Sequence, residues 1–206
     1  MRNVILIFFI IFSLSCNHAN SNTSVFSKRT PIVLSNEVSS MMLSLKSQTI
    51  LTTSYNAAYV MLDFPNGDVA INTGVCADVI IRALRANKID LQKEVHEDMS
   101  KHFKLYPNRW NLKSTDKNID HRRVANLMKY FERKQKSFAI TDNINDYKAG
   151  DIVAWKLDNG LLHIGMVYDE TSEDGTPLII HNIGSGAKVA NVLFQWEIIG
   201  HYRWFE

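Results

Sequence analysis

The sequence predicts an α+β fold, because helix-type patterning fills its first part and strand-type patterning its last part. Before residue 134, apolar residues recur every three to four positions in several segments, which is typical of helices that pack one face on a core. After Gly150, apolar and polar residues alternate, and turn sequences such as Asp158-Asn159-Gly160 separate the alternating runs, as in antiparallel sheets. Helices followed by strands favour helices packed on an antiparallel sheet.

Size and composition exclude several classes of protein. The chain has 206 residues, of which 46% are hydrophobic and 21% charged, values that suit one globular domain with a substantial core. A net charge of +2 is too small to indicate a nucleic-acid partner. Two cysteines cannot form a disulfide framework, and the histidines lack zinc-enzyme spacing. We therefore expect a monomer without metal or cofactor.

The first 16 residues have the features of an export signal. A short basic start precedes an apolar run over residues 4–12, which is shorter than the roughly 20 residues of a membrane span. Ser13-Leu14-Ser15-Cys16 resembles a bacterial lipobox, in which Cys16 would carry the lipid; ordinary cleavage beyond Cys16 is the alternative. We expect export to the periplasm, or an outer-membrane or cell-surface lipoprotein. Residues 17–33 would then form a polar tether and residues 34–206 a single domain.

Capping residues and apolar spacing place the helices. Asp120 is the expected N-cap of the last one. Between the first two helices, Tyr59-Val60-Met61-Leu62 predicts a short strand and Pro65-Asn66-Gly67-Asp68 a turn. The expected helices run from Ser35 or Asn36 to about Thr52, from Gly74 to Arg85, from Asp90 to Phe103 and from Val124 to Arg133.

The helix that begins near Gly74 carries a cysteine in its first turn. Helical spacing places Cys76 on the apolar half of this helix, and it places Asp78 and Arg82 on the other half as an exposed i,i+4 pair. Free backbone N–H groups at a helix start favour an anion, and a cysteine there can have its pKa lowered to roughly 3.5–7.5. The sequence thus offers a thiolate nucleophile, with a small buried side chain as the alternative.

Two histidines fall on one face of neighbouring predicted strands. If Tyr168 pairs with Thr176, His163 lies opposite His181, whereas a slip of one residue would put Asn182 in the place of His181. Gly165 between them would let a helix approach closely. Cys76, His163 and His181 would then form a nucleophile, its base and the group that orients the base. The strands are expected at 151–157, 162–168, 178–182 and 192–204.

Longer motifs resemble two known families. Residues 150–155 (GDIVAW), 163–168 (HIGMVY) and 179–182 (IIHN) resemble NlpC-type cell-wall cysteine peptidases and CHAP amidases. That resemblance implies a papain-like fold and assigns the catalytic roles to Cys76, His163 and His181. Much of the chain also resembles a bacterial envelope family of unknown function, DUF1287. Two features depart from the NlpC pattern: Val-Cys-Ala-Asp stands at residues 75–78 in place of Asp-Cys-Ser-Gly, and residues 90–146 form an insert.

The resemblance implies an exported cysteine amidase or peptidase that cleaves an amide bond in peptidoglycan stem peptides. A thiol acyltransferase is one alternative, and a non-catalytic, lipid-anchored module that binds cell-wall peptides is another. Paired arginines in the insert could grip substrate carboxylates bidentately. The residues expected to contact the substrate are His96, Asp120, His121, Arg122, Arg123 and Trp155.

Overall fold

The structure, a computed structural model, describes residues 33–206. The predicted leader with Cys16, and all but the last residue of the predicted tether, lie outside the described residues. Within the described part, no helix combines the length and apolar character that a membrane crossing requires. The elements are α1 (Asn36–Leu51), α2 (Cys76–Arg85), α3 (Leu91–His102), η1 (Phe103–Leu105), η2 (Asp120–Arg122), α4 (Val124–Arg133), η3 (Ile144–Asp146), β1 (Ile152–Lys156), β2 (Leu162–Thr171), β3 (Pro177–Asn182), β4 (Ala187–Ala190) and β5 (Glu197–Tyr202).

The strands form one sheet in the order β4-β3-β2-β1-β5, and every neighbouring pair is antiparallel. The first three predicted strands are confirmed. The run at 192–204 is a strand only over residues 197–202, and it pairs with β1 at the far edge of the sheet. The short strand β4 was not predicted, since its four residues include only one buried side chain and carry no alternating pattern.

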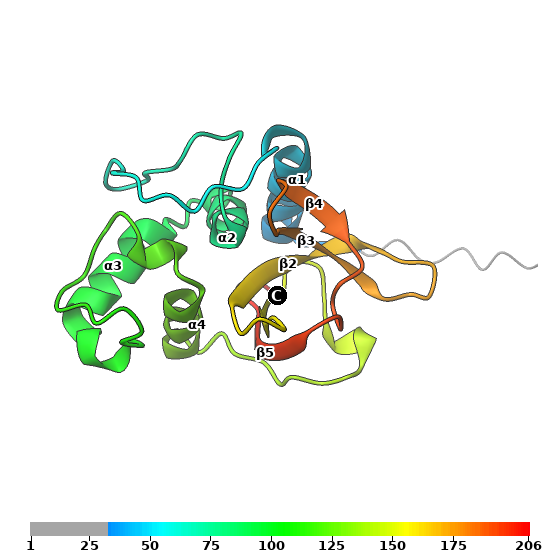
Figure 1. Cartoon of the computed structure of the whole chain (residues 1–206). Helices are drawn as coiled ribbons and strands as arrows, with labels where there is room; N and C mark the ends of the chain where they lie inside the picture. The colour runs from blue at the N-terminus through cyan, green and yellow to red at the C-terminus, as the bar shows by residue number, and fades with distance from the viewer. Residues whose placement is uncertain (1–32) are drawn as a thin grey trace, which may run out of the picture. The chain divides into compact units, whose positions relative to one another are not determined.

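Helices cover one face of this sheet, and a smaller apolar layer covers the other. α1, α2 and α4 pack against the strands, while α3 packs on α2 and α4 farther from the sheet (Figure 1). Ile164 and Met166 face the helices, whereas Val167 faces a second cluster that Tyr147 and Leu193 close. This is the arrangement of helices and antiparallel sheet expected for the papain-like α+β fold.

The predicted helices form, and the predicted N-cap of the first helix is confirmed. The Ser35 side chain accepts a hydrogen bond from the Val38 N–H, and the Asp90 side chain accepts one from the Gln92 N–H. The prediction that Asp120 caps α4 is wrong: α4 starts at Val124 with Arg123 in the cap position. The Asp120 carboxylate instead accepts the Asp116 N–H and so closes the preceding loop.

Residues 59–62 do not form the predicted strand. Met61 is 84% exposed, and the Leu62 N–H bonds to the Asn118 side chain rather than to a neighbouring strand. At Leu62 a side-chain acceptor therefore takes the place of a sheet partner. The turn that follows is confirmed near Pro65.

The charged half of α2 is buried, which corrects the prediction of an exposed Asp78–Arg82 pair. Asp78 accepts two hydrogen bonds of 2.9 Å from Arg122 and one of 2.6 Å from the Val75 N–H. Arg82 pairs with Asp68 at 2.9 Å instead. The helix lies between the sheet and the loops of the chain, so both of its faces are covered, and each charge has a buried or half-buried partner.

Replacing Arg122 tests how much this buried pair stabilises the fold. Arg122→Ala should lower the free energy of unfolding by about 3–5 kcal/mol, because it leaves the Asp78 carboxylate buried without its partner. The measurement is urea unfolding followed by circular dichroism. Lys93→Ala is the matched control, because it breaks an exposed pair with Glu97 and should cost less than about 1 kcal/mol. Equal effects of the two variants would contradict this account of the pair.

Candidate active site

Two imidazoles are in direct contact on the sheet face that is turned away from the helices. His163 Nε2 lies 2.8 Å from His181 Nδ1. The expected register is wrong by two residues, since Met166 pairs with Ile180 where the prediction paired it with Leu178. Side chains alternate along a strand with a period of two, so a shift of two residues leaves both histidines on the same face.

Gly165 makes room for this contact. A Cβ built at Gly165 would lie 2.7 Å from Ile179 Cγ2 and 3.2 Å from His181 Cβ. The expectation that Gly165 admits a helix is therefore wrong, because the space is needed by the neighbouring strand. With glycine at position 165, the His181 side chain fits beside it and reaches His163, its diagonal neighbour on the adjacent strand.

Aromatic rings enclose the histidine pair. The His163 ring stacks on Trp155 with centroids 5.8 Å apart, and both imidazoles contact Trp196. Burial, followed by the charge of His181, lowers the pKa of His163 to about 3. Burial, followed by the charge of Lys188, lowers the pKa of His181 to about 4. Both rings are therefore neutral at pH 7.

Trp155 is completely buried, which argues against the predicted substrate contact. Its Nε1–H donates to the Leu193 carbonyl at 2.9 Å. The indole stacks on the His163 ring and has no exposed surface that a ligand could contact.

Cys76 is a buried free thiol at the first residue of α2. Burial is the main cause that raises its pKa to about 11, and the charge of Asp78 raises it further. The backbone N–H groups of Ile164, Ala77 and Cys76 itself act in the opposite direction. The predicted low pKa is wrong, because the loss of solvent outweighs the stabilisation at the helix start.

The Cys76 thiol and the His163 imidazole lie on different sides of the sheet, but both lie next to the same part of β2. Cys76 packs with the helix-side core, and the amide that most lowers its pKa is that of Ile164, the residue after His163. The β2–β3 pair nearest to Ile164 is Met166↔Ile180. In residues 33–206 no hydrogen bond joins Cys76 to either histidine.

Asn182, the alternative orienting residue, does not contact His163. Its Nδ2 donates to the carbonyls of Gly74 and Ser54, and its Oδ1 accepts the Gly186 N–H. Asn182 therefore ties the loop before α2 to the end of β3, and His181 is the residue that holds the His163 ring.

Tyr55 is a candidate that sequence reasoning missed. Burial raises the pKa of its phenol first, and the charges of Cys76 and Asp78 raise it further. The phenol therefore lies within electrostatic range of the thiol, and Tyr55 is 41% exposed. Tyr55 precedes the cysteine by 21 residues in an irregular segment, so no local pattern could identify it.

Most of the insert residues predicted to bind substrate are buried. Arg122 is engaged by Asp78, and His121, whose pKa is lowered to about 4 by burial and then by Arg122, is only 2% exposed. Asp120 is also buried. Arg123 and His96 keep some exposure; the first pairs with Asp120 and the second packs on the Phe64 ring. In the described part, no three His, Cys, Asp or Glu side chains group closely enough to hold a metal ion.

A family model decides the classification of the chain. The domain of unknown function DUF1287 matches residues 43–204. The chain belongs to the DUF1287 family. A relative in Escherichia coli (strain K12), named "Uncharacterized protein YijF", is 58% identical over 154 residues, which are 75% of each chain.

Solved structures with a similar fold have low sequence identity to this DUF1287 chain. NlpC1 from Trichomonas vaginalis has a TM-score of 0.45 at 14% identity, over 85% of this chain and 47% of its own. The chain therefore spans about half the length of that protein. An N-acetylmuramoyl-L-alanine amidase from Bacteroides uniformis ATCC 8492 has a TM-score of 0.48 at 14% identity, over 81% of this chain and 98% of its own.

The buried histidines should make this DUF1287 protein sensitive to acid. Burial lowers the pKa values of His121, His163 and His181 below the ordinary 6.5. Between pH 6.5 and about 4 the unfolded chain takes up protons that the folded chain does not, so stability falls as the pH falls. Urea unfolding at pH 7 and pH 5 should differ by about 1–2 kcal/mol for each such histidine.

Two glutamine variants serve as the comparison for this pH effect. His163→Gln should reduce the difference between pH 7 and pH 5, since it removes one of the buried titrating groups. His102→Gln, at an exposed position, should leave the difference unchanged. Identical pH dependence in His163→Gln and wild type would show that His163 is not held neutral.

Proposed function

We propose that this protein is an exported cysteine amidase or peptidase that cleaves an amide bond in peptidoglycan stem peptides. The observation that carries the proposal is the His163–His181 contact at 2.8 Å. The residue after His163, Ile164, belongs to the same buried core as Cys76. A nucleophile, a base and a group that orients the base are the parts that acyl transfer from an amide needs. The motif resemblance to NlpC-type and CHAP enzymes supports the choice of substrate.

His163 acts as a general base in the proposed mechanism. Its Nε2 is engaged by His181, so Nδ1 is the nitrogen left to take a proton. In the tautomer this needs, Nε2–H donates to His181 Nδ1, and His163 Nδ1 accepts the thiol proton. Burial raises the pKa of Cys76 to about 11, so the thiol is protonated at pH 7. Its proton would therefore leave during attack, and no ion pair with His163 forms beforehand.

The reaction then proceeds through a thioester. Because the thiol and the His163 ring lie on different sides of the sheet, the proposed reaction requires the two groups to come together when substrate binds. The Cys76 sulfur would then attack the amide carbonyl as its proton passes to His163 Nδ1. His163 returns this proton to the leaving amine when the carbon–nitrogen bond breaks. A water molecule, deprotonated by the same nitrogen, attacks the thioester and frees the acid and the thiol.

We assign two donors to the negative oxygen of the intermediate. The first is the Cys76 backbone N–H at the start of α2, and the second is the Tyr55 hydroxyl. Of the paired arginines, Arg123 is the one that keeps a partly exposed side chain, so carboxylate recognition is assigned to it.

Substitution of the nucleophile and the base tests the proposal. Mass spectrometry of purified muropeptides should detect cleavage products with wild type. Cys76→Ala and His163→Gln should lower the rate at least about 10³-fold, because each removes a reacting group. His102→Gln, which changes an exposed histidine, should retain wild-type activity. Equal product formation by Cys76→Ala would refute the proposal.

Adding acceptor amines to the same assay separates hydrolysis from transfer. Hydrolysis predicts free acids as the products, whereas amine conjugates in excess over free acids would indicate an acyltransferase. Retention of uncleaved muropeptides by wild type and Cys76→Ala alike would indicate a binding module.

Removing the Tyr55 hydroxyl tests its role at the oxyanion. Tyr55→Phe should lower kcat about 10²-fold, the usual loss for one such donor, with KM little changed. Tyr59→Phe is the control, since this hydroxyl bonds to Asp116 and Asn118 at another part of the same segment. An unchanged kcat in Tyr55→Phe would remove Tyr55 from the site.

A further inference from the structure

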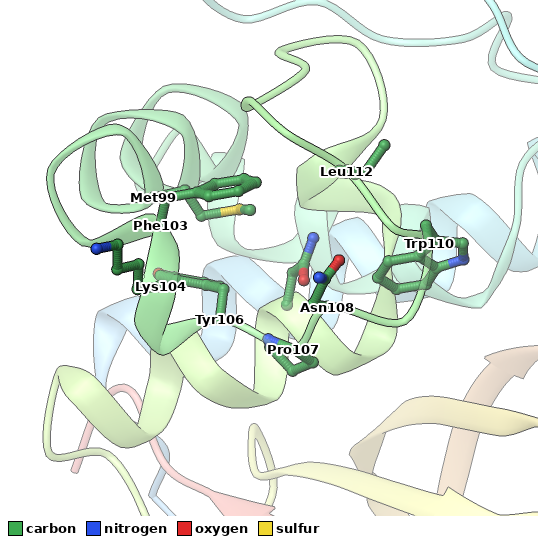
Figure 2. A pocket seen from close by; sticks show the side chains of 9 residues that line it. Met99, Phe103, Lys104, Tyr106, Pro107, Asn108, Trp110 and Leu112 are labelled. Atoms are coloured by element: carbon green, nitrogen blue, oxygen red, sulfur yellow. The ribbon is translucent and has the colours of Figure 1, made fainter.

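The insert contains a cavity of about 260 Å³ that none of the candidate catalytic residues lines. It lies between the end of α3, η1, the loop that follows and α4. Figure 2 shows Met99 and Phe103 on one side of the hollow and Trp110 and Leu112 on the other. The lining residues are Met99, Phe103, Lys104, Tyr106, Pro107, Asn108, Trp110, Leu112 and Asn126.

The walls of this cavity are mainly aromatic and aliphatic. Tyr106 contributes its ring, because its hydroxyl already donates to Asp98 at 2.7 Å, and Asp98 is also held by Arg133. Lys104 and Asn108 are the exposed polar residues at the edge. Apolar and aromatic walls with few polar groups are typical of small-molecule sites.

Asn126 supplies an unpaired acceptor in the wall. The side chain is 1% exposed, and its Nδ2 donates to the Asp120 carbonyl at 3.1 Å. This bond determines the orientation of the amide, because a carbonyl can only accept. The Oδ1 atom is buried without a hydrogen-bond partner among the described residues. Such an acceptor is unfavourable unless a donor reaches it. Because almost none of its own surface is accessible, a ligand donor reaches it only after a small shift of the surrounding wall.

Trp110 offers a stacking surface of defined orientation. The Arg123 guanidinium lies over the indole ring at 4.2 Å from its centroid, and the Asp120 carboxylate holds Arg123 in turn. One face of the indole is therefore covered by a cation that the fold positions. A ligand ring would stack on the opposite face.

We propose that this cavity binds an N-acetylated amino sugar of the peptidoglycan strand. The apolar ring face of a sugar matches the aromatic walls, and the acetamido N–H is the donor that Asn126 Oδ1 lacks. The acetyl methyl group suits the apolar side formed by Met99 and Phe103. A volume of about 260 Å³ lies just below the roughly 300–1,000 Å³ range of sites for drug-sized ligands, which suits one sugar unit.

The choice of a cell-wall sugar rests on the proposed function, while the need for an N–H donor and a ring face rests on the cavity alone. In this arrangement the insert would hold the glycan part of a muropeptide. The sheet and α2 would act on its peptide part. Substrates with the sugar attached would then bind more tightly than the free stem peptide.

A binding experiment without catalysis tests this site. Full-length Cys76→Ala protein is titrated with an N-acetylglucosamine trimer, a glucose trimer and a sugar-free stem peptide, and NMR and calorimetry follow binding. We expect saturable binding of the N-acetylated trimer, with shifts of the Asn126 side-chain amide and the Trp110 indole N–H. The glucose trimer should bind at least about tenfold more weakly.

A pair of aromatic substitutions supplies the matched control. Trp110→Ala should weaken binding of the N-acetylated trimer at least about fivefold, because it removes the stacking surface. Phe138 is equally exposed at 41% and lies under another guanidinium, that of Arg203, at 4.3 Å. Phe138→Ala should leave the affinity unchanged.

Four results would overturn the proposal. These are no binding of the N-acetylated trimer, equal binding of the glucose trimer, shifts caused only by the stem peptide, and equal loss of affinity in both aromatic variants. If Trp110→Ala does not fold, the NMR shifts in Cys76→Ala protein decide. Cleavage of sugar-free stem peptides by wild type tests the proposed catalysis separately, so the two proposals can fail independently.

Discussion

The Asp78 carboxylate is the group on which the arrangement of this protein depends. It accepts the Val75 N–H at the start of α2 and two hydrogen bonds from Arg122. One side chain thus closes the N-terminus of the cysteine helix and attaches the insert to it. The pair is nearly free of solvent, so loss of either partner would leave an uncompensated charge in the interior. The same carboxylate lies near the thiol and opposes its ionisation.

Burial sets the resting chemistry of the site. It keeps the Cys76 thiol protonated and both imidazoles neutral. A neutral imidazole can accept a proton, but a pKa of about 3 makes His163 a weak base in this buried state. A protonated thiol is not prone to unwanted reaction. In the proposed reaction the thiol would therefore lose its proton during attack rather than before it. The sheet contributes geometry: Gly165 admits His181 beside His163, and Trp155 supports the ring from the other side.

The insert between α2 and the sheet has a structural and a proposed recognition role. Arg122 on η2 binds Asp78, while its neighbour Arg123 binds Asp120 and covers Trp110. Consecutive residues therefore connect the cysteine helix to the aromatic cavity. This short connection is a physical route by which the DUF1287 insert and the candidate active site are kept in one relative position.

The sequence by itself determined the α+β class, the main helices and strands, and the shared face of His163 and His181. Each of these follows from periodicity or from capping residues such as Ser35, which act over a few positions. Because side chains alternate along a strand with a period of two, the prediction that both histidines share a face held although the register was wrong by two residues. The tertiary structure decided the rest. It gave Asp78 a partner 44 residues away, buried the thiol enough to raise its pKa, brought Tyr55 within electrostatic range of Cys76 and left Asn126 Oδ1 unpaired. These properties arise from burial and from contacts between distant segments, and neither is encoded in any local pattern.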